Sequence, residues 1–230
     1  MLGITVRRTV LLKTPDLSRR TDENGFNLNV ECSLLPCTRL EILSKENNMY
    51  RIHSEYASGY ICTEDAACGN CPDKNKFAIV TDKSVNINDT EYFMSTKIPV
   101  ENGRLKLPVN DSGKLRWIFK DIPDGVSLHT LKNTPQNIIS QAAKLLDMPY
   151  DWGEEHFSVD CSAFTKYVYA TVGTEIPRNS IDQKPFAAKS AENAKTGDII
   201  YIPGHVMIYI DGGFVIHASH SAGTVCISKL

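Results

Sequence analysis

The sequence predicts an α+β protein in which two small β-barrel domains precede a domain of helices and an antiparallel sheet. Short runs of alternating apolar and polar residues, separated by turns, fill the first 120 residues, as is typical of small barrels. Apolar residues at helical spacing begin only after residue 130, and alternating runs return after residue 197. These observations predict domains at residues 1–72, 73–130 and 131–230.

Two groups of short strands account for the two predicted barrels, with a division near residues 67–76. The expected strands are 38–44, 49–54, 59–62, 77–80, 84–87, 91–100, 103–109 and 114–122. Asn102-Gly103 and Ser112-Gly113 are dipeptides typical of tight hairpin turns, so we expect hairpins at both positions.

The third domain begins with two predicted helices. Thr134 followed by Pro135 supplies an N-cap and a first-turn proline for a helix over 136–147. Asp160 supplies a similar cap for a second helix over 161–172. Helices followed by strands make this domain α+β.

The charge balance excludes a strongly polyanionic partner. The chain has 25 basic and 27 acidic residues, a net charge of −2, which gives no general attraction to nucleic acid or anionic membranes. No apolar stretch approaches the roughly 20 residues of a membrane span. The start MLGITVRRTVLLKTP carries charges where a signal peptide has its apolar core. We therefore expect a cytoplasmic protein if the sequence is complete, and a periplasmic or secreted one if its natural start is missing.

Cys161 lies at the predicted start of the second helix, between Asp160 and Ser162. A helix N-terminus carries a partial positive charge, which stabilises a thiolate, the nucleophilic form of cysteine. This position suits a catalytic cysteine, and we expect iodoacetamide to alkylate it well below the usual thiol pKa of about 8.5. The alternative is a cysteine that only packs.

His205 and His217 lie on the two strands expected within residues 197–219. If the turn is Asp211 to Gly213, the two imidazoles share one face as diagonal neighbours, within reach of a ring-to-ring hydrogen bond. A two-residue turn would place them on opposite faces. A base oriented by a third polar group is what an activated nucleophile requires. The alternatives are ordinary strand histidines or two metal ligands.

Four segments resemble the NlpC-type cell-wall peptidases, which are papain-like cysteine enzymes that cut the stem peptides of peptidoglycan. They are PYDWGEEHFSVDCSAFTKYVYATVGTEIPRNSIDQ (149–183), KTGDIIYI (195–202), HVMIYI (205–210) and FVIHAS (214–219). They occur in the family's order, and the resemblance covers residues 135–230. Residues 27–61 are similar to the bacterial SH3-like domains that precede this catalytic domain in a subgroup acting on free murein peptides.

The resemblance implies a papain-like NlpC catalytic domain after two SH3-like β-barrels, with γ-D-glutamyl–diamino acid endopeptidase activity. It implies Cys161 as the nucleophile, His205 as the general base and His217 as the residue that orients it. The backbone N–H of Cys161 and the hydroxyl of Tyr150, which matches a family tyrosine, would stabilise the oxyanion. No metal or other cofactor is implied.

The same resemblance implies how the substrate is held. In the SH3-bearing subgroup, an Asp and a Ser beside the cysteine and a Tyr of the first SH3-like domain hold the free N-terminal amine of L-Ala. These residues correspond to Asp160, Ser162 and Tyr56, and Trp152 and Ser180 match further pocket positions. A carboxylate and hydroxyl groups are suitable partners for an ammonium group. Asp160 has the alternative role of a helix cap.

Three positions depart from the family pattern. Ala163 replaces a glycine after the serine, Gly153-Glu154 replaces two glycines, and Gly204 stands where a histidine often occurs. None of these changes removes a catalytic atom, so they bear on specificity more than on mechanism.

The other six cysteines fit three disulfides or six reduced thiols: Cys32, Cys37, Cys62, Cys68, Cys71 and Cys226. Cys68 and Cys71, with Cys32 and Cys37, are an alternative zinc set, but their spacing is irregular, and we expect no metal.

The leading hypothesis is a cysteine endopeptidase that cleaves the bond between γ-D-Glu and diaminopimelate or lysine in murein peptides with a free L-Ala, in cell-wall recycling or turnover. Its partners are peptidoglycan stem peptides, with no nucleic acid and no membrane. One alternative is a secreted hydrolase of intact peptidoglycan. Another is a cell-wall-binding protein with an inactive papain-like domain. The sequence leaves the oligomeric state open.

Overall fold

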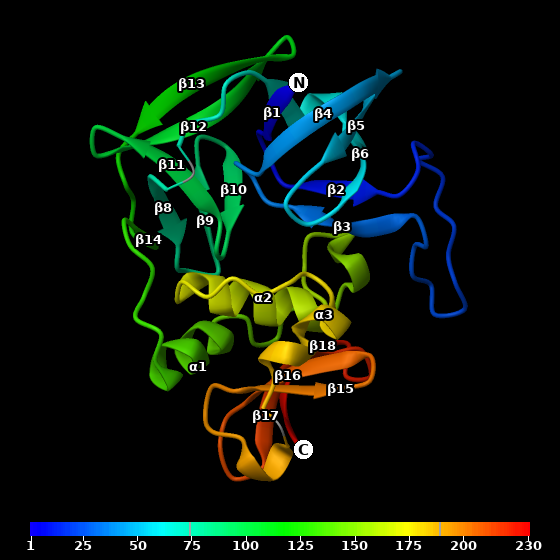
Figure 1. Cartoon of the computed structure of the whole chain (residues 1–230), viewed down its shortest axis with the longest axis vertical. Coiled ribbons are helices and arrows are strands. Elements are labelled where there is room, and N and C mark those ends of the chain that lie inside the picture. The colour runs from blue at the N-terminus through cyan, green and yellow to red at the C-terminus, as the bar shows by residue number, and fades with distance from the viewer. Residues whose placement is uncertain (74, 189) are drawn as a thin grey trace. The chain divides into compact units, whose positions relative to one another are not determined.

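A computed structural model describes residues 1–73, 75–188 and 190–230 (Figure 1). The chain divides into two compact units, residues 1–80 with 84–129, and residues 81–83 with 130–230. Among the described residues, no helix is both long and apolar enough to cross a membrane.

The described residues of the first unit form strands and one short 3₁₀ turn, Thr63–Asp65. Twelve strands form one sheet in the order β14-β8-β11-β12-β13-β7-β1-β4-β5-β6-β2-β3, and β9 pairs with β10 separately. The strands are β1 Leu2–Thr5, β2 Thr9–Leu12, β3 Val30–Leu34, β4 Arg39–Glu46, β5 Met49–His53, β6 Ser58–Cys62, β7 Ala66–Cys68, β8 Phe77–Val80, β9 Ser84–Ile87, β10 Thr90–Phe93, β11 Lys97–Glu101, β12 Arg104–Asp111, β13 Lys114–Lys120 and β14 Val126–Ser127.

Two main apolar clusters fill the first unit. One contains Leu11, Leu40 and Ile52 with their neighbours from β2 to β7. The second draws mostly on β8 to β12, and Ile4 and Cys37 from the beginning of the chain also belong to it. Residues of the first predicted barrel therefore pack into the core of the second, and one continuous sheet runs through both. The SH3-like character of the two barrels stays a prediction.

Both predicted hairpin turns are confirmed. Asn102 and Gly103 have φ values of 52° and 75°, and the strand pair Glu101↔Arg104 closes around them. Ser112 and Gly113 show the same geometry, with φ values of 52° and 89°. Two successive residues with positive φ match the right-handed twist of the flanking strands, which is why Asn-Gly and Ser-Gly suit these positions.

The strand predicted over 91–100 is wrong, because the structure divides it into β10 and β11. Ser95 has φ of 68°, in the left-handed region that interrupts a strand. The hydroxyl of Thr96 donates to the Phe93 carbonyl at 2.6 Å, which closes the turn. The strands β1, β2 and β3 were not among the predicted ones.

The second unit contains the predicted helices and an antiparallel sheet, so its α+β class is confirmed. The helices are α1 Pro135–Ala143, α2 Cys161–Thr171 and α3 Ser180–Gln183, with 3₁₀ turns at Trp152–Glu154, Lys184–Phe186 and Ala191–Asn193. The sheet has the order β15-β16-β17-β18, formed by β15 Ile199–Ile202, β16 His205–Tyr209, β17 Phe214–Ser219 and β18 Thr224–Lys229.

The predicted N-terminus of the first helix is confirmed, but its predicted C-terminus is wrong. Thr134 caps α1, accepting the backbone N–H of Asn137 at 3.3 Å. The helix ends at Ala143 rather than residue 147, because the next backbone bonds, such as that from Leu145 to Ala142, are of the tighter i to i−3 type.

Two strands were predicted over residues 197–219, and the structure has three strands there, β15, β16 and β17. A turn at Pro203-Gly204, with Gly204 at φ of 81°, separates β15 from β16, and β18 adds a fourth strand beyond the predicted region.

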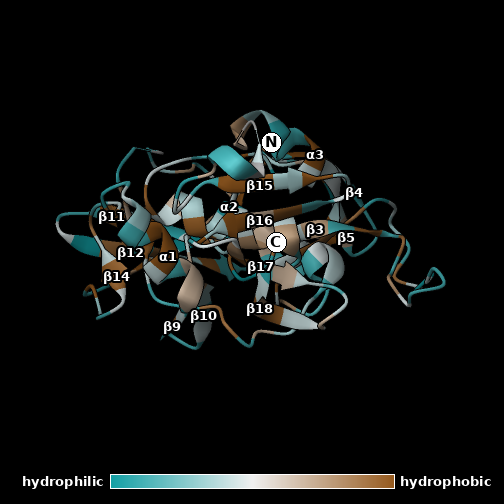
Figure 2. Ribbon diagram, turned by 90° about the horizontal axis from the view of Figure 1, so that it is seen from below, coloured by the Kyte–Doolittle hydropathy of each residue, from teal (hydrophilic) through white to brown (hydrophobic). Residues whose placement is uncertain are grey.

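Helix α2 is the buried centre of this unit. Each of its residues is buried, and Val206, Met207 and Ile208 of β16 are buried too. Figure 2 shows hydrophobic and polar residues along α2 and β16 by their colours. A helix buried on every side is held firmly, so its first residue has a fixed position.

Candidate active site

Cys161 is the first residue of α2, and Asp160 is its N-cap, as predicted. One Asp160 oxygen, Oδ1, accepts the backbone N–H of Ala163 at 2.8 Å. This bond satisfies one of the helix's unpaired amides and fixes where the helix begins. The Cys161 side chain is therefore held at the helix N-terminus, where only 6% of the residue is exposed.

The structure contradicts the expectation of a lowered thiol pKa. Burial and the neighbouring Asp160 carboxylate raise the pKa of Cys161 to about 11. Hydrogen bonds from the backbone of Val206 and Ser162, and the charge of Arg178, oppose this rise only in part. The helix N-terminus is favourable to a thiolate, but the same carboxylate that caps the helix places a negative charge beside the sulfur.

Alkylation of Cys161 should therefore become faster with rising pH up to about pH 11, with little reaction below pH 7. The reaction with iodoacetamide, followed by mass spectrometry of the peptide that contains Cys161, measures this profile. A plateau reached below pH 8 would show instead that the thiolate is stabilised in the resting protein.

His205 and His217 adopt the predicted register. Ile208 pairs with Ile216, and the backbone N–H of Ile210 donates to Phe214 at 2.8 Å, which fixes the turn at Asp211 to Gly213. The two histidines are joined by a hydrogen bond of 2.6 Å between His205 Nε2 and His217 Nδ1. The predicted ring-to-ring contact is confirmed.

The strand that carries His205 contacts the thiol. Val206 directly follows His205, and its backbone forms a hydrogen bond with the Cys161 side chain. Because Nε2 of His205 faces His217, Nδ1 is the nitrogen left to receive a proton. Burial and the neighbouring His217 lower the pKa of His205 to about 4, so its imidazole is neutral at neutral pH. A protonated thiol beside a neutral imidazole suits general-base activation of the nucleophile.

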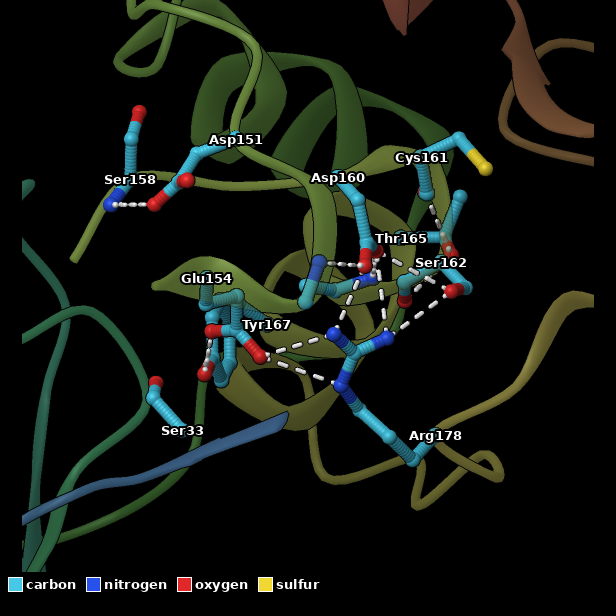
Figure 3. Close-up of polar contacts among 12 residues, drawn as sticks. Ser33, Asp151, Glu154, Ser158, Asp160, Cys161, Ser162, Thr165, Tyr167 and Arg178 are labelled. Carbon is cyan, nitrogen blue, oxygen red and sulfur yellow. Dashed lines mark hydrogen bonds and ion pairs between the residues drawn. The ribbon is translucent and has the colours of Figure 1, made fainter. Parts of the chain in front are cut away.

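The structure also reveals a buried ion-pair network that the sequence reasoning missed (Figure 3). The Arg178 guanidinium lies between Asp160 and Glu154, donating to Asp160 Oδ2 at 2.7 Å and to Glu154 Oε2 at 3.0 Å. It also donates to the Ser162 hydroxyl at 2.9 Å. Burial alone would raise the pKa of Asp160, but the charge and hydrogen bonds of Arg178 bring it below its usual value.

Glu154 explains one of the three departures from the family pattern. It is fully buried and has φ of 64°, directly after Gly153 at 68°. A left-handed backbone costs a residue other than glycine on the order of 1 kcal/mol. The Glu154 carboxylate contacts Arg178 and accepts a hydrogen bond from the Tyr167 hydroxyl, and these interactions stabilise the conformation.

The remaining predicted residues fall in both units. In the second unit, Tyr150 is half-buried, and its pKa is raised by burial and by the charges of Asp160 and Cys161. Trp152 begins a 3₁₀ turn and Ser180 begins α3, both half-buried. Tyr56 belongs to the first unit, in the turn between β5 and β6, against that unit's first apolar cluster.

The described residues show neither a disulfide nor a metal cluster. None of the seven cysteines is joined to another by a disulfide in this part of the chain. Within the described ranges, no group of three or more His, Cys, Asp or Glu side chains could hold a metal ion.

Sequence comparisons point to one family. Residues 147–230 match the NlpC/P60 family. The chain is 29% identical over 179 residues to a Gamma-D-glutamyl-L-lysine dipeptidyl-peptidase of Bacillus cereus, covering 67% of this chain and 53% of that protein. It is 34% identical over 112 residues to the Peptidoglycan endopeptidase RipB of Mycobacterium tuberculosis, covering 40% of this chain and 46% of that protein. The chain thus spans about half the length of these relatives.

One solved structure has a fold similar to that of the whole chain. The crystal structure of an NlpC/P60 family protein from Bacillus cereus covers 100% of this chain, and the chain covers 94% of it, with a TM-score of 0.78 and 19% identity. At this identity the likeness concerns the fold alone. The matched sequence of residues 147–230 shows that the chain carries an NlpC/P60 domain there.

Proposed function

We propose that the chain is a cysteine endopeptidase that cleaves the γ-D-glutamyl–diamino acid bond of murein stem peptides with a free N-terminal L-Ala. The observation that carries this proposal is the hydrogen-bonded pair of His205 and His217, on a hairpin whose Val206 backbone contacts the thiol of Cys161. The name of the Bacillus cereus relative supports the choice of bond, since it specifies a γ-D-glutamyl-L-lysine linkage.

The geometry supports a reaction in two halves. Cys161 Sγ attacks the γ-carbonyl carbon of D-Glu while its proton passes to Nδ1 of His205. The resulting oxyanion is stabilised by the backbone N–H of Cys161 and the hydroxyl of Tyr150. His205 then gives its proton to the leaving amine of the diamino acid, and a thioester remains. In the second half, His205 removes a proton from water, which attacks the thioester and releases the D-Glu carboxylate and the thiol.

The structure supports a refined role for Asp160 in binding the substrate amine. Its two oxygens already accept hydrogen bonds from Gly153, Ala163 and Ser162, and two from Arg178. A carboxylate offers about four lone-pair positions, so an ammonium group can bond Asp160 directly only by displacing one of these donors.

The Ser162 hydroxyl donates to Asp160 and accepts from Arg178, and it keeps one lone pair for the ammonium. We therefore propose that Ser162 accepts a hydrogen bond from the amine, and that Asp160 acts through its charge. A part for Tyr56 stays what the family resemblance implies. Trp152 and Ser180 complete the proposed pocket.

The test compares L-Ala-γ-D-Glu-diaminopimelate and L-Ala-γ-D-Glu-lysine peptides, each with a free and with an acetylated alanine. We expect the free-amine peptides to be cleaved at least tenfold faster than the acetylated ones, as detected by mass spectrometry, because the acetylated nitrogen has no charge to pair with Asp160. The Cys161→Ala variant serves as the inactive control. Equal cleavage of both forms would contradict the proposed role of Asp160 and Ser162.

A hydrolase of intact peptidoglycan is the second candidate. It is favoured by the 34% identity to a protein named Peptidoglycan endopeptidase, which exceeds the identity to the dipeptidyl-peptidase. Incubation with purified sacculi decides between the two, since a hydrolase of the intact wall releases soluble fragments from them. Binding to sacculi without cleavage of any substrate would favour a cell-wall-binding protein instead.

A further inference from the structure

The polar chain that begins at Cys161 does not end at His217. In the pairing of β17 with β18, His217 faces Cys226, and Ser228 lies two residues further along β18. The Ser228 hydroxyl oxygen is 2.9 Å from Nε2 of His217, the ring nitrogen that does not contact His205. Ser228 lies outside the segments that carry the family resemblance.

We propose that Ser228 is a positioning residue, which sets the tautomer of His217 and through it the tautomer of His205. This inference rests on the proposed function, because it concerns the state in which His205 can act as a base.

Proton transfer from Cys161 determines where the proton of each imidazole must be. For His205 to accept a proton from Cys161, its Nδ1 must be bare, so its own proton is on Nε2. That N–H then donates to Nδ1 of His217 across 2.6 Å, which requires Nδ1 of His217 to be bare as well. The proton of a neutral His217 is therefore on Nε2, and Ser228 Oγ is there to accept it.

The opposite tautomer would disable the site. If Ser228 did not accept from Nε2, the proton of His217 could occupy Nδ1 and donate to His205 Nε2. His205 would then carry its proton on Nδ1, pointing away from His217, and could not accept one from the thiol. An imidazole held in the wrong tautomer is known to disable general-base catalysis even where the geometry is intact.

Burial makes the acceptor at Nε2 necessary. Only 8% of His217 is exposed, so water cannot fully replace a lost partner. Among the described residues, Cys226 Sγ also lies near Nε2, at 3.9 Å. Sulfur is a weak acceptor, so the hydroxyl of Ser228 is the stronger partner of the two. Cys226 is thus a natural control, since it contacts the same ring from the same strand.

The experiment measures the tautomer directly, by ¹⁵N NMR of the histidine rings in the full chain, together with kcat and KM on the free-amine peptide. In the unaltered protein we expect His217 protonated on Nε2 and bare on Nδ1. Ser228→Val and Ser228→Thr form a matched pair of similar volume, with and without the hydroxyl. We expect Ser228→Val to shift the tautomer and to lower kcat about tenfold with KM unchanged. Ser228→Thr and Cys226→Ala should keep both properties.

Two results would overturn the inference. One is a Ser228→Val variant with the original tautomer and kcat, and the other is an equal change in Cys226→Ala, which would indicate a general effect of altering β18. If Ser228→Val does not fold, Ser228→Ala makes the same comparison. If the unaltered protein cleaves none of the peptides, the proposed function fails, whereas the NMR comparison still decides the role of Ser228.

Discussion

Replacing His205 with alanine is expected to lower kcat/KM for the free-amine stem peptide by about 10⁴-fold at pH 7. The reason is the resting state of the nucleophile. With the pKa of Cys161 raised to about 11, roughly one thiol in 10⁴ is ionised at pH 7 without help. Removal of His205 leaves only this fraction to react. The measurement is the rate of peptide cleavage, with Cys161→Ala as the baseline.

The pH dependence distinguishes a lost base from a damaged fold. In the unaltered protein, His205 acts as a base only when neutral, and its lowered pKa means that activity is present above about pH 4 and is lost as the pH falls through that value. In His205→Ala, the rate should instead rise about tenfold for each pH unit above 7, because hydroxide must ionise the thiol. A rate in His205→Ala that does not change with pH would contradict this account.

The hairpin that carries the histidines shows what the sequence can predict. The Asp211-Gly212-Gly213 turn has a strong local signal, because both glycines adopt positive φ, at 59° and 82°. Once that turn is placed, strand register follows from the two-residue period of the side chains. The contact of His205 with His217 therefore depends only on residues close to one another in the sequence, and the prediction is confirmed.

The properties of the thiol could not be predicted in the same way. The helix N-terminus was visible in the sequence, and it favours a thiolate. The raised pKa of Cys161 depends on burial first and on the distance to the Asp160 carboxylate second. Both are properties of tertiary packing, so local rules gave the wrong direction.

Long-range polar partners were missed for a related reason. Arg178 contacts Glu154 across 24 positions of sequence, and no periodic pattern links these two residues. Ser228 contacts His217 from β18, a strand that was not predicted. The Gly153-Glu154 departure was one available signal, since a carboxylate that occupies a glycine position requires a partner that compensates for the strained backbone.

Replacing Arg178 with methionine is expected to lower the free energy of unfolding by about 3–5 kcal/mol at pH 7, the usual effect of breaking a buried ion pair. The Arg178, Glu154 and Asp160 side chains are only 8%, 0% and 9% exposed, so the substitution takes the guanidinium away from two carboxylates that stay buried. Urea denaturation followed by circular dichroism measures the loss. Arg104→Met is the matched control, because Arg104 and its partner Asp121 are 50% and 91% exposed and we expect less than about 1 kcal/mol.

The size of this loss should depend on pH in a direction that the carboxylates determine. Arg178 keeps the pKa of Asp160 below its usual value, so the ion pair contributes stability above the unfolded pKa of about 3.9, and that contribution is lost as the pH falls through the lower folded pKa. In Arg178→Met only burial and the remaining hydrogen bonds act on Asp160, so its pKa rises and it takes up a proton at a higher pH. The difference between the two proteins should therefore shrink from pH 7 to pH 4. A difference that stays constant over this range, or that equals the Arg104→Met control, would mean that Arg178 contributes packing rather than charge.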